Sequence, residues 1–180
     1  MKKLTLKEIT ATALMTALLC VAAPFTIPTG IIPISLASFV VYLAAAILGA
    51  KKGVLCVLLY ILLGAAGLPV FSGFAGGLGK IAGPTGGYIV GYIFCALIVG
   101  LISDRWGTRL WVYPAAMAAG TAVLYAFGTV WFMAQSGSGL AASLALCVVP
   151  FLVGDIVKII VASGAGFTLR RRVADRVLKK

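Results

Sequence analysis

The sequence contains no histidine and only four acidic residues, and Lys, Arg, Asp and Glu together occupy just 11% of its 180 positions. A soluble domain carries about 25% charged residues, so this chain is too apolar to be one. The missing histidines and scarce carboxylates leave few groups for a metal centre or for acid–base catalysis. The cysteines lie singly in apolar runs, which favours buried small hydrophobic side chains over disulfides or metal ligands. We therefore expect no metal and no cofactor. The cysteines are Cys20, Cys56, Cys95 and Cys147.

What the chain has in abundance is hydrophobic residues, at 62% of all positions. Apolar stretches with the length needed to cross about 30 Å of hydrocarbon recur along it, with no sizeable soluble region between them. These features predict an all-α integral membrane protein in the lipid bilayer, with six transmembrane helices in a single domain over residues 1–180. The expected spans cover residues 9–25, 35–50, 54–68, 85–102, 110–134 and 140–169.

The first span resembles a secretory signal peptide in one respect, because Lys2 and Lys3 precede its apolar run. However, Leu19 stands where a small residue would precede the cysteine of a lipoprotein signal, and Glu8 interrupts the basic region. The run is also long enough to cross a membrane. We expect it to be retained as the first transmembrane helix.

The basic residues are distributed in a way that indicates an orientation. Six spans place both termini on one side. If that side is the cytoplasm, the inner segments hold thirteen of the 15 Lys and Arg residues, including those of the basic tail 170–180. The outer loops hold only Lys80, and Lys158 falls inside the last span. This pattern follows the positive-inside rule. The net charge of +11 therefore reflects orientation in a prokaryotic-type plasma membrane and not nucleic-acid binding. The glycine-rich loop between the third and fourth spans then faces the exterior.

That loop, within residues 67–92, has many glycines for a membrane connection, which favours an ordered lid or pocket wall. Two nucleotide motifs in it are incomplete. The match to a dinucleotide fingerprint at Gly77 lacks a preceding soluble strand, and Ile81 replaces the Ser or Thr that ends a Walker A motif. The loop instead offers backbone hydrogen-bonding groups and three aromatic rings that can cover a small apolar ring. These rings belong to Phe71, Phe74 and Tyr88.

Small residues recur at helical spacing in two places. Ala13 and Ala17 form a small-xxx-small pair in the first span, and glycines recur every fourth residue into the fourth span. Close packing inside the bundle is the simplest explanation of the glycines. For the two alanines, the residues alone leave open whether they contact the bundle or an external partner. The glycines are Gly79, Gly83, Gly87 and Gly91.

The last span contains two opposite charges, Asp155 and Lys158, at positions i and i+3, so their side chains share a helix face. One such charge near the centre of a membrane helix costs about 2.5–3.5 kcal/mol, which favours a function. The pair can be a self-satisfied ion pair that fixes helix packing. It can also be a polar patch that grips a ligand carrying both N–H and C=O groups. A proton relay would need further charged groups in the other expected spans, and their sequences contain none.

Three motifs together resemble the BioY family, the biotin-binding S components of energy-coupling factor (ECF) transporters. They are GLPVF at residues 67–71, GPTGGY at 83–88 and DxxK at 155–158, in the order the family has them. The resemblance covers essentially the whole chain. It implies a six-helix subunit, not an enzyme, that captures biotin at the external face. It also implies docking onto a transmembrane T subunit that is driven by two cytoplasmic ATP-binding cassette subunits.

The same resemblance implies roles for particular residues. Asp155 and Lys158 become ligand contacts, with Asp155 facing a ureido N–H of biotin. Lys158 is left open between the ureido oxygen and the carboxylate. The loop up to Tyr88 would enclose the ligand, and Ala13 and Ala17 match the AxxxA pattern with which S components meet the T subunit. The expected ligand contacts are Asp155, Lys158, Phe71, Phe74, Gly76, Gly77, Thr85 and Tyr88.

Three alternatives are compatible with the sequence. A stand-alone carrier would move biotin without an ATP-driven partner, and an S component for another vitamin would share the fold. A small intramembrane enzyme is disfavoured, because no expected span contains a Ser/His pair, a second carboxylate or a metal cluster. We therefore expect no catalytic residues.

Overall fold

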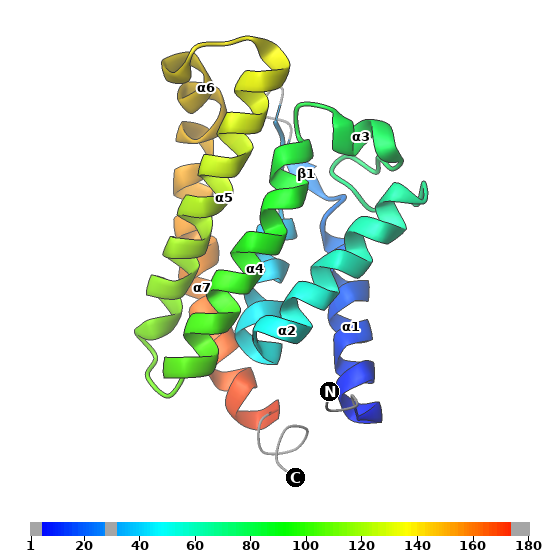
Figure 1. Cartoon of the computed structure of the whole chain (residues 1–180). Helices are drawn as coiled ribbons and strands as arrows, with labels where there is room; N and C mark the ends of the chain where they lie inside the picture. The colour runs from blue at the N-terminus through cyan, green and yellow to red at the C-terminus, as the bar shows by residue number, and fades with distance from the viewer. Residues whose placement is uncertain (1–4, 28–31, 174–180) are drawn as a thin grey trace.

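The computed structural model describes residues 5–27 and 32–173, and within them the chain is a helical bundle with one very short hairpin (Figure 1). The all-α class is confirmed, since the two strands are only two residues long each. Lys2, Lys3, residues 28–31 of the predicted outer loop and residues 174–180 of the basic tail lie outside the described residues. The elements are α1 (Leu6–Ala22), β1 (Thr26–Ile27), β2 (Ile34–Ser35), α2 (Ala37–Ala65), α3 (Leu78–Ala82), α4 (Gly86–Trp106), α5 (Val112–Ser136), α6 (Leu140–Cys147) and α7 (Val149–Val173).

Four of the described helices, α2, α4, α5 and α7, are long and apolar enough to cross a membrane. Helix α1 is shorter, with 17 residues, and it packs against α2. It begins at a capping box, in which the Thr5 backbone N–H donates to Glu8 Oε2 at 2.8 Å and the Glu8 backbone N–H donates to Thr5 Oγ1 at 3.4 Å. The start of α1 is therefore encoded locally, at the boundary where its apolar run begins.

The long helix α2 consists of two arms that meet at Gly49, whose φ of 81° and ψ of 178° are not helical. Glycine is the residue that adopts this conformation without strain. A side chain here would also collide with the Asp104 carboxylate, which accepts the backbone N–H of Ala50 at 2.9 Å. The sequence predicted two spans here, separated at Lys51 and Lys52. The structure instead places the bend at Gly49 and keeps both lysines in the helix.

The expected final span, residues 140–169, is divided into α6 and α7. Val148 separates them, with φ of −125° and ψ of −55°. Pro150 follows in the first turn of α7, where a missing N–H is tolerated, whereas inside one continuous helix its ring would clash with a preceding carbonyl. The break starts α7 so that Phe151, Asp155 and Lys158 share the face that points into the bundle.

Two glycines allow α4 to approach α5 closely. A Cβ on Gly87 would collide with Trp131, and a Cβ on Gly91 would press on Leu124. These positions agree with the predicted packing inside the bundle. Gly79, in contrast, lies in α3 with open space where its Cβ would be, so the four-residue repeat is used for packing only from α4 onward.

The start of α1, the bend of α2, the α4–α5 turn and the end of α7 meet at one end of the bundle (Figure 1). Lys52 of α2 pairs with Glu8 of α1 at 2.8 Å, and Arg170 of α7 pairs with a carboxylate at the end of α4 at 2.8 Å. Helices α3 and α6 lie at the opposite end (Figure 1). Apart from Lys80 and Lys158, the described basic residues belong to the first end. The two ends therefore differ in charge as the positive-inside pattern predicts.

Candidate functional site

A narrow cavity lies where the hairpin and α2 face α4, α5 and α7. Its volume is about 40 Å³, whereas pockets for drug-sized ligands usually measure about 300–1,000 Å³. In this state the cavity has room for a few water molecules. Its wall combines polar side chains with aromatic rings. The lining residues are Ile32, Pro33, Ser35, Ser38, Tyr60, Ser72, Thr85, Tyr88, Ile89, Tyr92, Leu124, Tyr125, Phe151, Asp155 and Lys158.

The ion pair predicted from the last span forms in this wall. Lys158 Nζ lies 2.9 Å from Asp155 Oδ1, and the two side chains are only 11% and 8% exposed. Lys158 also donates to the backbone carbonyl of Ser35 at 2.7 Å and to Ser38 Oγ at 3.1 Å. An ammonium group has three donors, and these three acceptors engage them all. An oxygen of a ligand can bind Lys158 only by displacing one of them.

Asp155 retains some capacity to accept hydrogen bonds. Its Oδ1 accepts from Lys158 and, at 3.4 Å, from the Ser38 hydroxyl. Its Oδ2 accepts from the Tyr125 hydroxyl at 2.6 Å. A carboxylate offers about four lone-pair sites, so one site on Oδ2 remains available among the described contacts. Because an ionised carboxylate only accepts, the ligand group that binds there must be a donor.

Aromatic rings form the apolar part of the wall. The rings of Tyr88 and Phe151 lie 6.4 Å apart between centroids, with their planes inclined by 30°. The Tyr88 hydroxyl donates to the backbone carbonyl of Cys147 at 2.7 Å. Cys147 ends α6, where a carbonyl has no partner inside its own helix, so the break between α6 and α7 supplies the acceptor that fixes this ring. An apolar wall with a few placed polar groups is typical of small-molecule sites.

Four of the eight predicted ligand contacts line the cavity together: Asp155, Lys158, Thr85 and Tyr88. They come from the start of α4 and from α7, which are far apart in sequence. The other four predicted contacts belong to the glycine-rich loop and lie outside the cavity wall. A contact of these four with a ligand stays a prediction.

Two aromatic residues of the loop have other neighbours. Phe71 is completely buried, with its ring against Gly64 of α2 and edge-on to Tyr60 at 5.4 Å. Phe74 is 59% exposed and packs edge-on against Phe25 at 5.5 Å. Phe71 therefore anchors the loop on α2, while Phe74 covers the outside of the segment that follows α1.

The two loop glycines shape the backbone. Gly77 has a φ of 89°, and its N–H donates to the carbonyl of Gly64 at 2.7 Å. Gly76 approaches the carbonyl of Leu68 so closely that a Cβ would collide with it. The loop is further held by the Gly73 N–H, which donates to the carbonyl of Pro24 at 3.0 Å. These contacts hold the loop against α2 and against the segment that follows α1.

Several cavity residues were not singled out from the sequence. Ser35 and Ser38 bind Lys158, and Tyr125 binds Asp155, across sequence separations of at least 30 residues. Each is a small or singly polar side chain in a largely apolar segment, which is a weak signal of an internal partner. Without the fold, nothing indicates which partner that is.

Ala13 and Ala17 lie on the exposed face of α1, while Thr12, Thr16 and Leu19 face the bundle. The exposed face also carries the apolar side chains of Leu6, Leu14, Leu18 and Val21. The two alanines thus form a shallow strip between larger apolar side chains. Their contacts are not with α2, which packs on the other side of α1.

Comparisons with known proteins agree on one family. The model of the BioY family matches residues 1–175 of the chain. The biotin transporter BioY of Thermotoga maritima is 36% identical over 171 residues, covering 95% of this chain and 100% of that protein. A probable biotin transporter BioY of Pyrococcus horikoshii is 40% identical over 152 residues, covering 84% of this chain and 89% of that protein.

A solved structure has the same fold. It is described as the crystal structure of the S-component for biotin from an ECF-type ABC transporter. Its chain aligns with a TM-score of 0.85 at 28% sequence identity, and the alignment covers 92% of this chain and 91% of that one. The likeness therefore includes the helices that build the cavity.

Proposed function

The chain belongs to the BioY family, as its motifs predicted, and we propose that it is the biotin-binding S component of an ECF-type importer. It is a multi-pass protein of the prokaryotic plasma membrane, and it is a transport protein and not an enzyme. One observation carries the proposal: the buried Asp155–Lys158 pair lies in the wall of an internal cavity. A buried ion pair alone is a poor source of stability, so a ligand role explains its presence better.

The cavity chemistry suits the parts of biotin. The ureido ring has two N–H donors and one C=O acceptor beside them, and it is fused to an apolar thioether ring. We assign one ureido N–H to the available lone pair on Asp155 Oδ2. The thioether ring then packs against the rings of Tyr88 and Phe151, which are held 6.4 Å apart.

Lys158 has two potential acceptors on biotin, the ureido oxygen and the carboxylate. The short distance of 2.9 Å between Nζ and Asp155 Oδ1 supports the ureido oxygen. Biotin presents a ureido N–H and the ureido C=O on neighbouring atoms of one edge. The N–H can bind the Asp155 carboxylate while the C=O binds Lys158, because the two side chains lie side by side. In this arrangement the ureido oxygen replaces Ser35 or Ser38 as an acceptor of Lys158.

Loading must enlarge the cavity, because about 40 Å³ is too small for a bicyclic ligand. We propose that the loop between α2 and α3 moves, since it brings Ser72 to the cavity wall. The backbone hydrogen bonds that tie it to other segments include the Gly77 N–H to the Gly64 carbonyl at 2.7 Å and the Gly73 N–H to the Pro24 carbonyl at 3.0 Å. Breaking two such hydrogen bonds costs about 1–3 kcal/mol, which binding energy can supply.

The proposed topology has six spans with both termini in the cytoplasm. The spans are α1, the two arms of α2 on either side of Gly49, α4, α5 and α7. The gathering of basic residues at the end that contains the α4–α5 turn supports this orientation. The cavity and the glycine-rich loop then lie toward the exterior, where biotin is captured.

Delivery is proposed to depend on a T subunit and two ATP-binding cassette subunits. The exposed apolar strip of α1 around Ala13 and Ala17 supports a helical partner at this face. Small residues at i and i+4 allow a partner helix to approach closely, and the adjacent leucines add contact area.

The experiment that tests the proposal is a binding titration of the purified protein with biotin, thiamine and riboflavin. We expect saturable binding of biotin alone, and much weaker binding in Asp155→Asn. Binding of another vitamin in place of biotin would contradict the assignment. Uptake of biotin in a host that lacks the ATP-driven module would favour a stand-alone carrier instead.

A further inference from the structure

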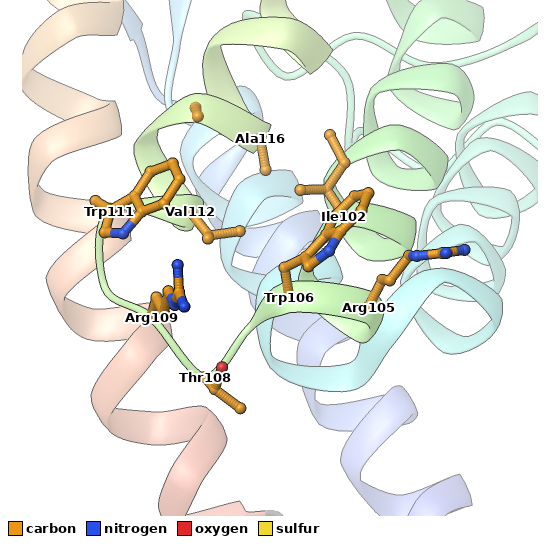
Figure 2. Close-up of a pocket in the computed structure, with 9 residues that line it drawn as sticks. Ile102, Arg105, Trp106, Thr108, Arg109, Trp111, Val112 and Ala116 are labelled. Atoms are coloured by element: carbon orange, nitrogen blue, oxygen red, sulfur yellow. The ribbon is translucent and has the colours of Figure 1, made fainter.

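A second cavity, of about 590 Å³, lies at the α4–α5 turn (Figure 2). It is at the basic end of the bundle and shares no lining residue with the biotin cavity. We call it the turn groove. The residues that decide its chemistry are Ile102, Arg105, Trp106, Arg109, Trp111 and Val112.

Two arginines make the turn groove positive. Figure 2 shows Arg109 rising from the turn toward the groove, while Arg105 extends away from Arg109 on the far side of Trp106, with its guanidinium 5.2 Å from the centroid of the Trp106 ring. None of the described residues that line the groove is acidic. Asp104, the neighbouring carboxylate, instead binds Arg170 at 2.8 Å. Within residues 5–27 and 32–173, neither groove arginine forms an ion pair, so both charges are available to an external anion.

The rest of the groove is apolar and aromatic. Trp106 and Trp111 are 53% and 65% exposed, and Ile102 and Val112 form the wall between α4 and α5 (Figure 2). Exposed tryptophans at a helix end are typical of the boundary between membrane and water. The groove therefore has a charged mouth at the headgroup level and an apolar wall that continues along the two helices.

We propose that the turn groove binds an anionic phospholipid, such as phosphatidylglycerol. The phosphate lies at Arg109, Arg105 adds positive charge at the rim, and the first part of an acyl chain covers Ile102 and the exposed indole rings. Basic pockets between transmembrane helices at the cytoplasmic side are suited to anionic headgroups. A free phosphate would use only the guanidinium groups and leave both indole rings and the apolar wall exposed. An acidic protein segment would match the charge but not a wall that faces the membrane. An amphiphile satisfies both parts of the groove.

The test uses the tryptophans of the groove as reporters. Trp131→Phe removes the third tryptophan of the chain, so that fluorescence comes from Trp106 and Trp111. This variant is reconstituted in phosphatidylcholine bilayers that contain a small share of lipid with brominated acyl chains, either phosphatidylglycerol or phosphatidylcholine. Bromine quenches tryptophan fluorescence on contact. The quenching constant for brominated phosphatidylglycerol divided by that for brominated phosphatidylcholine therefore measures the lipid preference. We expect a preference for phosphatidylglycerol of about fivefold for each arginine that contributes.

The decisive variant is Arg105→Gln with Arg109→Gln, for which the preference should fall to near one. The matched control is Lys51→Gln with Arg172→Gln, which removes the same charge from the same end of the bundle but lies outside the groove. This control should keep the preference. Arg109→Gln alone should remove part of it. Retained biotin binding shows that each variant is folded.

Several outcomes would overturn the proposal. One is equal quenching by both lipids in the parent protein. Another is an equal loss of the phosphatidylglycerol preference in the groove variant and in the control, which would indicate an effect of general surface charge only. Loss of the preference on adding millimolar inorganic phosphate would indicate a small-anion site. In the variant Arg105→Gln with Arg109→Gln, an unchanged lipid preference together with lost co-purification of the energy-coupling subunits would show that the groove contacts a protein.

Discussion

Tyr125 and Asp155 are joined by a hydrogen bond of 2.6 Å, in which the Tyr125 hydroxyl donates to Asp155 Oδ2 while Lys158 occupies Oδ1. The carboxylate is therefore held on both oxygens, by Tyr125 of α5 on Oδ2 and by Lys158 of its own helix together with Ser38 of α2 on Oδ1. Both residues also border a groove of about 270 Å³ between α5 and α7. Tyr125 thus borders both this groove and the cavity, and its hydrogen bond fixes the orientation of the Asp155 carboxylate.

Tyr125→Phe should weaken biotin binding moderately. The ring remains, but the hydrogen bond that orients Asp155 is lost, which is worth about 0.5–1.5 kcal/mol or about a 2- to 12-fold increase in Kd. Isothermal titration of the purified protein measures this change. Tyr42→Phe is the matched control, because Tyr42 makes an equally short hydrogen bond, 2.6 Å to Thr121, outside the cavity wall. An equal loss in both variants would mean that Tyr125 acts only through general packing.

Asp155→Asn should raise the Kd for biotin strongly while the bundle still folds, with a lower unfolding temperature because Lys158 loses its buried anion. The substitution preserves shape, but it removes a charge-assisted hydrogen bond worth about 1.5–3 kcal/mol, or about 10- to 150-fold in Kd. Titration with biotin gives the affinity, and thermal unfolding in detergent shows whether the bundle is intact. Unchanged affinity would remove Asp155 from the binding site.

Lys158→Ala should weaken biotin binding and also destabilise the protein. It leaves the Asp155 carboxylate buried without its cation, and breaking a buried pair in this way costs about 3–5 kcal/mol. The expected signs are a lower unfolding temperature without ligand and a smaller stabilisation on adding biotin. A variant as stable as the parent would show that Ser38 and Tyr125 alone compensate the carboxylate.

Local spacing was enough to predict part of this site. Asp155 and Lys158 are one helical turn apart, so any helix over this segment brings them together. The contacts that complete the site join distant segments: Ser35 reaches Lys158 across 123 residues, and Tyr125 reaches Asp155 across 30. No local period encodes such contacts, because they depend on how α5 and the hairpin dock on α7.

The glycine-rich loop shows a different limit. Its order was predictable, because glycines are needed where φ is positive or where backbones approach closely. The direction in which its aromatic rings point was not, and Phe71 turns toward Gly64 instead of into the cavity. The bend of α2 was expected near Lys51 for reasons of charge, but the backbone conformation of Gly49 sets it. In both regions, glycine positions carried more information than the polar or aromatic residues beside them.

Gly49→Ala should destabilise the bundle. At φ of 81° and ψ of 178° a residue with a Cβ is strained by about 1–3 kcal/mol, and the methyl group would also collide with the Asp104 carboxylate. We expect a clear drop in the unfolding temperature, measured in detergent. Gly139→Ala is the control, because Gly139 has φ of −67° and open space around it. A stable Gly49→Ala variant would mean that the two arms of α2 can meet without this conformation.

Ala13→Leu combined with Ala17→Leu should block biotin uptake while leaving biotin binding intact. Both alanines are exposed on α1 and lie on the face opposite the bundle. Two added leucine side chains would therefore not disturb the fold, but they would prevent close approach of a partner helix. We expect co-purification with the T subunit and uptake to fall by at least about tenfold, which corresponds to about 1.4 kcal/mol of lost association energy.

The control for this variant is Ala141→Leu with Ala145→Leu, which has the same i, i+4 spacing on the exposed face of α6. It adds the same apolar volume to the surface and should leave assembly and uptake unchanged. Loss of biotin binding in the α1 variant would instead indicate that the leucines shift α1 against α2 and that α1 supports the cavity. Normal uptake with both leucines in place would exclude this face as the docking surface, because a helix packed on Ala13 and Ala17 has no room for them.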